Sequence, residues 1–290
     1  MSVSVIGLGK IGSEIVPHLL SLGDEVKVWN RSQAAIDKAV ELGATAATDL
    51  SEAFTSNLVI SALFDDQAVM ATMTSELISQ AAATQTLHVC LSTLSPDLVD
   101  DLVKLHAVAG VGYVSAPLFG RPEAVRQQAA NICVAGNAEL IERARPYLET
   151  FGRVWPIGQE PRQANVAKLC GNYLIGAAVA AMAEATAILN MQGADVDGFM
   201  SLMTETLFSC PIYTNYAPSV TGTRPLPPTG LALPMKDMEL LAAVAGNDAA
   251  KTGILTALRE QLSRAATMGL GAEDWSVALG GLARQSHVHP

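Results

Sequence analysis

Short apolar runs alternate with amphipathic segments through the first 160 residues of the chain. Apolar runs of about four to eight residues predict buried strands, and apolar residues three and four positions apart predict helices. Regular strand–helix alternation is typical of an α/β fold with a mainly parallel, doubly wound sheet. We expect strands at 2–6, 25–29, near 45, 58–63, 87–91, 112–116, 131–135 and 154–157, and helices at 12–22, 33–42, 50–53, 66–78, 96–109 and 138–151.

A long apolar stretch, residues 163–193, follows this alternation. It lacks proline, carries few charges and is rich in Ala, Leu, Met and Ile, all of which favour helix. About 30 helical residues would span about 45 Å, more than the diameter of a small domain, so we expect this helix to connect two domains. Its most apolar part, 169–183, is shorter than the roughly 20 residues of a membrane span and contains Asn172, which predicts a buried helix instead.

The remaining residues show helical patterns only, so we expect an all-helical second domain. Predicted helices cover 195–206, 237–245, 251–268 and 274–284. Ser209-Cys210-Pro211 is expected to break the chain, and 220–233, rich in Pro, Gly and Thr, to form a loop or lid. Tyr213, Tyr216 and Trp275 are candidates to face a substrate, with core or interface packing as the alternative.

A glycine motif, GLGKIG, links the first predicted strand to the first predicted helix. Gly7, Gly9 and Gly12 form the G-x-G-x-x-G pattern, which allows a tight turn, close approach to a pyrophosphate and close helix–strand packing. The phosphates would sit at the helix N-terminus. We therefore predict that a dinucleotide binds here, and that Leu8, Lys10 and Ile11 share the site. A glycine-rich turn in another kind of α/β unit is the alternative.

The second strand ends in Asn30-Arg31-Ser32. NAD-binding sites usually carry Asp or Glu at this strand end, where it binds the ribose hydroxyls. Here an arginine follows instead, and a guanidinium binds a 2′-phosphate through charge-assisted hydrogen bonds. NADPH/NADP is therefore the predicted cofactor, with a solvated loop charge as the alternative role of Arg31. Further along the same sheet edge, we assign Leu63 and Phe64 to the cofactor site.

Three segments follow from these patterns: a Rossmann domain that binds NADP (1–160), an interdomain helix (161–193) and an all-helical substrate and dimerisation domain (194–290). A chain of 290 residues with 50% hydrophobic content is large enough for two domains. A long apolar helix beside an all-helical domain would leave apolar surface exposed in a monomer, so we expect a homodimer.

Net charge indicates which binding partners to expect, and the cysteine content indicates the cellular compartment. The net charge of −10 argues against nucleic-acid and anionic membrane partners. The four cysteines are widely spaced, so we expect free thiols in a reducing cytoplasm. Met1 leads directly into a predicted strand, so we expect no secretory signal. His287 and His289 belong to a polar tail, and we expect no metal site.

Several motifs stand in a characteristic order: GLGKIG, NRS, STLSP, APLFGRP, AKLCGNYL and PMKDMELL. Together they resemble the β-hydroxyacid dehydrogenase family, which includes 3-hydroxyisobutyrate dehydrogenase and glyoxylate and succinic semialdehyde reductases; imine reductases share that architecture. The resemblance covers nearly the whole chain and also implies a dimer. It implies that Lys168 and Asn172 are catalytic, that Ser92 and Thr93 contact the nicotinamide side, that Lys236 lies near the cofactor and that Asp237 lies near the substrate.

The substrate loop departs from the pattern of that family. The family commonly has D-A-P-V-S-G-G where this chain has Ser115 to Arg121, with Pro117, Leu118, Phe119, Gly120 and Arg121 as candidate substrate contacts. Phe119 replaces the serine that would touch a substrate carboxylate, and Arg121 replaces the second glycine. Thr229 stands where an aromatic residue is often found. The substrate head group therefore stays open.

Lys168 suits carbonyl chemistry. When hydride reduces a carbonyl, an alkoxide develops, and a lysine ammonium can stabilise that charge and donate the proton. In reverse, the neutral amine would take the alcohol proton, and partial burial favours that neutral form. We predict an NADPH-dependent reductase of small aldehydes or keto acids. The alternatives are an imine reductase or reductive aminase, whose members usually lack this lysine, and a non-catalytic NADPH-binding protein.

Overall fold

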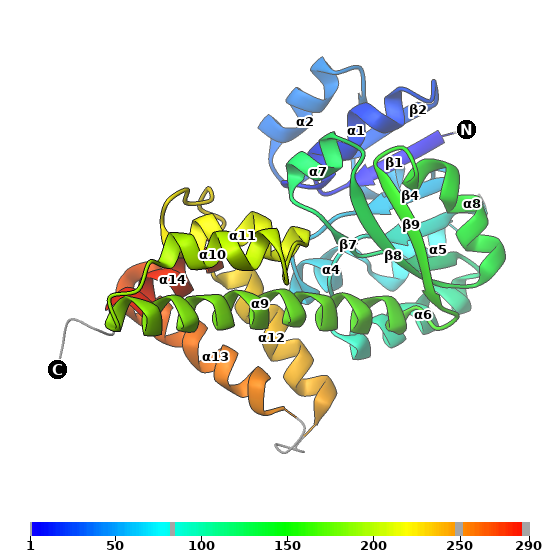
Figure 1. Ribbon diagram of the computed structural model, residues 1–290. Helices are drawn as coiled ribbons and strands as arrows, with labels where there is room; N and C mark the ends of the chain where they lie inside the picture. The colour runs from blue at the N-terminus through cyan, green and yellow to red at the C-terminus, as the bar shows by residue number, and fades with distance from the viewer. Residues whose placement is uncertain (1, 82–84, 247–251, 286–290) are drawn as a thin grey trace. The chain divides into compact units, whose positions relative to one another are not determined.

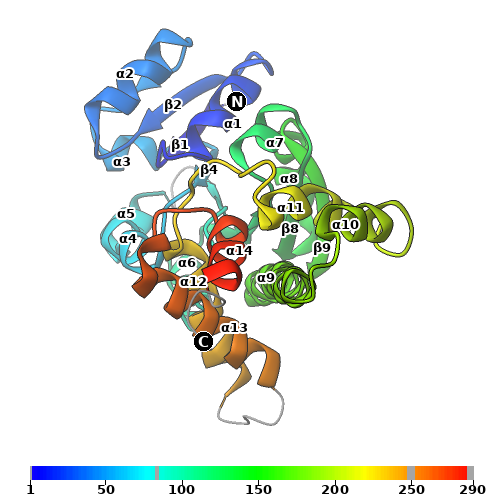
Figure 2. The same ribbon diagram turned by 60° about the vertical axis from the view of Figure 1, so that its left-hand side comes forward.

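The computed structural model describes residues 2–81, 85–246 and 252–285. The chain forms two compact units, Met1–Lys168 and Leu169–Pro290. Figure 1 shows the first unit as a sheet with helices and the second as a set of helices, and Figure 2 shows both from another side. The division at Lys168 falls inside one helix, whereas the three-part division at 160 and 193 stays a prediction.

A mainly parallel sheet forms the centre of the first unit, which confirms the predicted fold class. Its strands follow the order β3-β2-β1-β4-β5-β6-β8-β7, and β9 pairs with β8. Among the described strands, β8 pairs antiparallel with β6 and β7 and parallel with β9, so β8 and β9 run opposite to the other strands. The strands are β1 (Ser2–Ile6), β2 (Glu25–Trp29), β3 (Thr45–Ala46), β4 (Leu58–Ser61), β5 (Leu87–Cys90), β6 (Gly112–Ser115), β7 (Leu118–Phe119), β8 (Ala130–Gly136) and β9 (Gly152–Gly158).

Two hydrophobic cores cover the two faces of this sheet, because alternate strand residues point to opposite sides. Val3 and Val5 pack in one core with α1, α2, α7 and α8, whereas Ile6 packs in the other with α3, α4, α5 and α6. The helices are α1 (Gly12–Leu20), α2 (Gln33–Glu41), α3 (Leu50–Ala53), α4 (Asp66–Thr72), α5 (Ser75–Gln80), α6 (Pro96–Ala109), α7 (Pro122–Arg126) and α8 (Ala138–Leu148).

The second face of the sheet contains a buried chain of hydrogen bonds. The Ser61 hydroxyl lies 2.8 Å from Nε2 of His88, and Nδ1 of His88 lies 2.8 Å from Nε2 of His106. Nδ1 of His106 lies 2.7 Å from the carbonyl oxygen of Leu102, which can only accept. His106 therefore donates to Leu102, His88 donates to His106, and Ser61 donates to His88. Both imidazoles are neutral in this arrangement.

The second unit is helical around one apolar core. Its first helix, α9, begins in the first unit and continues without a break into the second. Among the described helices, α9 alone is long and apolar enough to cross a membrane, although core helices of soluble proteins meet the same criteria. The helices are α9 (Arg162–Met191), α10 (Val196–Glu205), α11 (Pro211–Thr221), α12 (Ala232–Ala245), α13 (Gly253–Ala265), the π-helical turn η3 (Ala266–Leu270) and α14 (Trp275–Gln285).

Several expected elements differ from the structure. The helix expected over 66–78 is two helices, because Met73 leaves the helical region (φ −95°, ψ 68°) and the Thr74 hydroxyl caps α5. The loop after β6 contains the short strand β7 and the helix α7. Pro211 starts α11 instead of merely breaking the chain, since proline is accepted at the first helical position.

The helix predicted from 237 begins earlier, at Ala232, so Lys236 and Asp237 lie in its second turn. The segment before α12 is consequently a shorter loop than the predicted 220–233. Other expectations fall outside the described residues: part of the turn at 246–248, the start of the helix expected from 251, and the two tail histidines.

Candidate functional site

The glycine loop between β1 and α1 has the geometry of a dinucleotide-binding turn. Gly7 has φ +95°, and a Cβ added there would lie 2.5 Å from the carbonyl oxygen of Ala62. A Cβ on Gly12 would overlap the carbonyl oxygen of Gly7, whereas one on Gly9 would meet no atom of the described residues within 4 Å. The first and third glycines are therefore required by packing, and the second leaves open space.

The N-terminus of α1 follows the glycine loop directly. Within the described part of the chain, no side chain caps α1 at Ile11, and the N–H groups of Ser13 and Glu14 already donate to the carbonyl oxygens of Gly9 and Ile11, so a ligand would be held by the N–H groups that precede them. A phosphate satisfies such groups and is attracted by the helix dipole. The loop therefore fits a pyrophosphate.

Asn30 supports the glycine loop. Its Oδ1 accepts a hydrogen bond from the backbone N–H of Leu8 at 3.1 Å, and the N–H of Gly7 donates to the carbonyl oxygen of Trp29 at 2.9 Å. These two bonds join the end of β2 to the turn after β1. Asn30 thus holds the loop in position, which adds a structural role to its predicted place in the cofactor site.

A cavity of about 330 Å³ lies between the glycine loop and α2. Leu8, Ser13, Ser32 and Lys38 are among the residues that line it. Ser32 stands at the N-cap of α2 without a side-chain capping bond among the described residues, and the neighbouring Arg31 is exposed. Lys38 was not among the residues predicted for the site, although a lysine on the helix that follows NRS could have indicated it.

The predicted cofactor residues of the next two strand ends contact each other. The backbone N–H of Leu63 donates to the Ser92 hydroxyl at 2.9 Å, and Ser92 is buried. Phe64, next to Leu63, is largely exposed, and Thr93 is partly buried. The loops after β4 and β5 are therefore joined at the same edge of the sheet as the glycine turn.

Asn165, which was not predicted as a site residue, joins two of the predicted loops. Its Oδ1 accepts from the N–H of Leu94 at 2.8 Å, and its Nδ2 donates to the Ser115 hydroxyl at 2.7 Å. Asn165 is fully buried in the first turn of α9. One side chain thereby fixes the loop of Ser92 and Thr93 and the start of the substrate loop. An amide one turn before Lys168, inside an apolar stretch, was the signal in the sequence.

Lys168 lies one turn after Asn165 and is 9% exposed. Its Nζ lies 4.0 Å from the centre of the Phe119 ring, a cation–π contact. The Cys133 thiol is close enough for the charge of Lys168 to act on it; burial raises the pKa of Cys133, and the lysine charge partly opposes this effect. The ammonium therefore has an aromatic ring and a protonated thiol among its neighbours.

The substrate loop is anchored by pairing with β8. The carbonyl oxygen of Pro117 accepts from the N–H of Cys133 at 2.9 Å, and Leu118 pairs with Ile132. Gly120 has φ +149°, in the range that favours glycine, and Arg121 stands at the N-cap of α7. The loop thus has a defined conformation that presents Phe119 on the side opposite to Leu118.

The other predicted site residues belong to the second unit. Asn172, four residues after Lys168 on α9, donates from Nδ2 to Oδ2 of Asp237 at 2.6 Å. Asp237 is 1% exposed, and Nζ of Lys236 lies 3.3 Å from its Oδ1. The structure therefore gives Asp237 the role of holding Asn172, and its predicted contact with a substrate stays a prediction.

The candidate aromatic residues of this unit pack against its core. Tyr213 stacks on Phe208 with ring centres 4.6 Å apart, and Tyr216 meets Trp275 edge to face at 6.3 Å. All three candidates adjoin the hydrophobic core of the second unit. Packing thus accounts for each of them, and the predicted substrate contact of Tyr213 stays a prediction.

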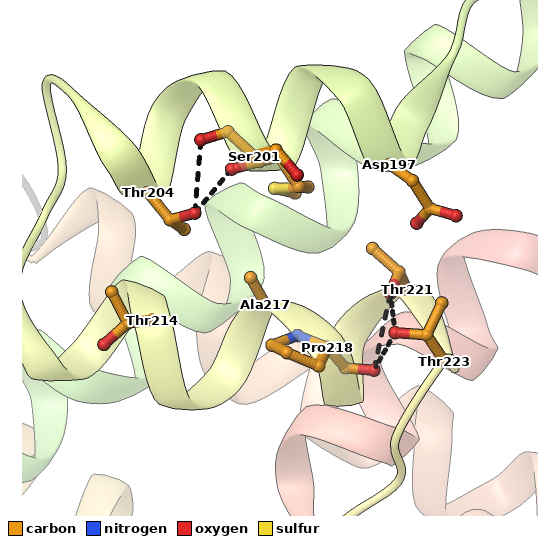
Figure 3. A pocket seen from close by; sticks show the side chains of 9 residues that line it. Asp197, Ser201, Thr204, Thr214, Ala217, Pro218, Thr221 and Thr223 are labelled. Carbon is orange, nitrogen blue, oxygen red and sulfur yellow. Dashed lines mark hydrogen bonds between the residues drawn. The ribbon is translucent and has the colours of Figure 1, made fainter.

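A second cavity, of about 300 Å³, is lined by residues of α10, α11 and the chain just after α11. Figure 3 shows Asp197 and several threonines around it. The Thr204 hydroxyl donates to the carbonyl oxygen of Met200 at 2.8 Å and that of Thr214 to Cys210 at 3.1 Å, so these donors are used within their own helices. None of the described residues predicted for the site lines this cavity.

Within residues 2–81, 85–246 and 252–285, no three or more His, Cys, Asp or Glu side chains are close enough together to hold a metal ion. The polar side chains that line the cavity beside the glycine loop are the hydroxyls of Ser13 and Ser32 and the ammonium of Lys38, which suit phosphates. The chemistry of this part of the site is therefore that of a nucleotide cofactor.

Two family models match the chain and together cover almost all of it. Residues 2–171 match the NAD-binding domain of 6-phosphogluconate dehydrogenase. Residues 163–281 match the model described as the NAD-binding domain of NADP-dependent 3-hydroxyisobutyrate dehydrogenase.

Relatives among known proteins match over nearly their full length. An uncharacterized oxidoreductase of Bacillus subtilis, YfjR, is 29% identical over 284 residues, covering 96% of this chain and 99% of the relative. The mitochondrial 3-hydroxyisobutyrate dehydrogenase of Drosophila melanogaster is 24% identical over 290 residues, covering 95% of this chain and 87% of the relative.

Solved structures share the fold. A 3-hydroxyisobutyrate dehydrogenase of Mycobacterium tuberculosis, solved with L-serine, superposes with a TM-score of 0.82 at 21% identity over 97% of this chain and 98% of that chain. A reductive aminase of Aspergillus terreus, solved with NADPH and ethyl levulinate, gives a TM-score of 0.63 at 22% identity over 96% and 98%. The chain belongs to the β-hydroxyacid dehydrogenase family of NAD(P)-dependent oxidoreductases, which has imine reductases as structural relatives.

Proposed function

We propose that this protein is an NADPH-dependent reductase of small carbonyl compounds, with Lys168 as the proton donor. The observation that carries the proposal is the buried ammonium of Lys168, next to Phe119 of the substrate loop. A lysine is costly to bury, so its place beside two loops at the ligand-binding edge of the sheet calls for a chemical role. Asn165 holds both loops in position beside it.

The chemistry assigned to Lys168 is a proton transfer. A bound reduced nicotinamide supplies hydride to the carbonyl carbon of the substrate. The Lys168 ammonium hydrogen-bonds the carbonyl oxygen, stabilises the negative charge that develops on it and transfers one proton to give the alcohol. In the reverse direction the neutral amine accepts the proton of the alcohol.

Asn172 assists from the next turn of the same helix. Residues four apart lie on one face of an α-helix, so Lys168 and Asn172 project from the same side of α9. The bond from Asn172 to Asp237 fixes the amide, which then orients the substrate oxygen or the lysine. Asn172 is thus proposed as the second catalytic residue.

NADPH is proposed over NADH because cations and hydroxyls surround the place expected for the ribose. Ser32 and Lys38 line the cavity beside the glycine loop, and the exposed Arg31 stands next to it in the chain. Two cations and a hydroxyl suit a 2′-phosphate, whereas an acidic residue would suit the free ribose hydroxyls.

The test is a comparison of wild-type and Lys168→Ala protein on a panel of aldehydes, keto acids and cyclic imines with NADPH. Loss of a general acid costs about 10²- to 10⁴-fold in rate, so kcat/KM for carbonyl reduction should fall by that factor. The affinity for NADPH, measured by its fluorescence, should stay within about threefold, equivalent to less than about 1 kcal/mol. Lys104→Ala, at an exposed lysine of α6 paired with Asp101, is the matched control.

Two results would replace this proposal. If cyclic imines are reduced and carbonyls are not, the protein is an imine reductase or reductive aminase. If NADPH binds but none of the panel oxidises it, the protein is a non-catalytic NADPH-binding protein. Unchanged carbonyl reduction by Lys168→Ala would remove the lysine from the mechanism.

A further inference from the structure

An ion pair joins the helix of the glycine loop to the helix that follows the substrate loop. Nε of Arg126 donates to Oε2 of Glu14 at 2.9 Å, and Nη2 donates to Oε1 of the same carboxylate at 2.6 Å. Glu14 lies in the first turn of α1 and Arg126 in the last turn of α7, and Figure 1 shows these two helices side by side. The guanidinium therefore binds both oxygens of a carboxylate that lies next to the glycine loop.

The carboxylate of Glu14 lies where a phosphate is expected to bind. The N–H of Ser13 donates to the carbonyl oxygen of Gly9, so a ligand would be held by the N–H groups before Ser13, within one turn of Glu14. The partial positive charge of a helix N-terminus attracts a carboxylate and a phosphate alike. When both anions are present in one turn, they repel each other. An uncompensated Glu14 would therefore weaken the binding of a dinucleotide.

Apolar packing, and not the ion pair, holds α7 in place. Val125 of α7 is fully buried in the same core as Ile15 and Val16 of α1, and β7 pairs with β8 just before α7 begins. The side chain of Arg126 is 62% exposed, and exposed ion pairs contribute little to stability. Removal of the pair should accordingly change the charge at the start of α1 without displacing α7.

We propose that Arg126 is a positioning residue of the cofactor site, whose guanidinium neutralises Glu14 and so keeps the first turn of α1 favourable for the pyrophosphate of the cofactor. Arg126 acts through Glu14 and not by contact with the cofactor. The inference goes beyond the proposed reaction, because it requires only that a dinucleotide binds at the glycine loop. NADPH and NADH share the pyrophosphate, so the effect on both affinities is the same.

Four proteins test this charge compensation: wild type, Arg126→Gln, Glu14→Gln and the double variant. The Kd values for NADPH and NADH are measured by nicotinamide fluorescence at low ionic strength. Arg126→Gln leaves the charge of Glu14 uncompensated, so both Kd values should rise by about three- to tenfold. Glu14→Gln should bind both cofactors at least as tightly as wild type. The double variant should return to within about twofold of wild type, since no carboxylate is left to repel the phosphates.

Ionic strength provides a second measurement on the same proteins. The Debye length is about 30 Å at 0.01 M salt and about 3 Å at 1 M, so repulsion between Glu14 and the pyrophosphate is screened at the higher concentration. The ratio of Kd values between Arg126→Gln and wild type should therefore fall toward one at 1 M salt. A purely structural role of Arg126 would leave this ratio unchanged.

Two further variants control for charge and for loss of an ion pair elsewhere. Arg126→Lys keeps the positive charge without the two-pronged geometry, so its Kd values should stay within about threefold of wild type. Arg145→Gln removes a comparable pair, in which Nε and Nη2 of Arg145 bind Glu142 within α8, and should leave both Kd values unchanged. Urea unfolding of each variant, with a midpoint close to that of wild type, shows that the fold is kept.

Three outcomes would overturn the inference. The first is an unchanged affinity in Arg126→Gln. The second is a double variant that binds as weakly as Arg126→Gln, which would mean that Arg126 contacts the cofactor itself or supports the fold of the site. The third is a loss of affinity for NADPH alone, which would point to the 2′-phosphate. Because the test measures binding only, it stands even if Lys168→Ala shows that the proposed chemistry is wrong.

Discussion

Arg31 and Lys38 carry the proposed preference for NADPH, each through a single positive charge. Arg31→Ala should raise the Kd for NADPH by about tenfold or more, since a hydrogen bond to a charged group contributes about 1.5–3 kcal/mol, and should change the Kd for NADH much less. Lys38→Ala should act in the same direction. Fluorescence titration with both cofactors measures the ratio, and Arg143→Ala, at an exposed arginine of α8, is the control. An equal loss of affinity for NADPH and NADH would mean that these cations do not bind the 2′-phosphate.

At the residue scale, helical spacing placed Lys168 and Asn172 on one face of a helix. Their catalytic role was implied only by the family resemblance that the ordered motifs carry, and neither source predicted what surrounds Lys168. The roles of Asn165 depend on Leu94 and Ser115, which are 71 and 50 positions away in the chain. Such pairings arise from the order of strands in the sheet, and no local pattern encodes them.

At the element scale, the buried histidines on β5 and α6 make stability depend on pH. Burial lowers the pKa of His106 to about 4, and burial with the neighbouring His106 lowers that of His88 well below its usual value. Between pH 6.5 and 4 the unfolded chain therefore binds protons that the folded protein does not. The stabilisation is complete above pH 6.5 and is lost as the pH falls toward 4.

The free energy of unfolding should accordingly fall over this interval, with about 3 kcal/mol attributable to His106. Urea unfolding at a series of pH values measures the slope. His106→Gln, which keeps an acceptor for Nδ1 of His88, should lower stability at pH 7 and flatten the slope. His18→Gln, on α1, is the control for loss of an imidazole elsewhere. A slope unchanged in His106→Gln would contradict this origin.

Element types were predictable from the sequence, and several ends were not. Continuous apolar runs indicate strands such as β4 and β5 because these are buried on both faces, and apolar residues at period 3.6 indicate helices because a helix buries one side against the core. The break between α4 and α5 depends on the backbone at Met73, and the early start of α12 lies in a segment where Pro and Gly suggested a loop. The antiparallel pairing of β8 is likewise a property of the whole sheet.

At the scale of the whole molecule, exposed apolar residues on α9 support the predicted dimer. Leu174, Ile188 and Met191 are 66%, 61% and 63% exposed, and their positions recur at helical spacing along one side. Exposed apolar side chains on a helix are candidates for an interaction surface, and a second copy of the chain is the partner that the resemblance to the family implies.

The double variant Leu174→Glu with Ile188→Glu should therefore convert dimer to monomer. Light scattering after size exclusion measures the mass at micromolar concentration. Val108→Glu, at an apolar residue of α6 that is 90% exposed, adds a like charge in the first unit and should leave the mass unchanged. A monomeric wild-type protein, or a double variant that still dimerises, would exclude α9 as the interface.

The three glycines of the first loop differ in whether the surrounding protein leaves room for a side chain. A Cβ at Gly7 or Gly12 would collide with the backbone of the protein, whereas a Cβ at Gly9 would meet no atom of the described residues within 4 Å. We therefore expect substitutions at Gly7 and Gly12 to act on folding and a substitution at Gly9 to act on the predicted cofactor site. Gly9 is thus the position at which we expect protein engineering to change cofactor affinity with little effect on the free energy of unfolding.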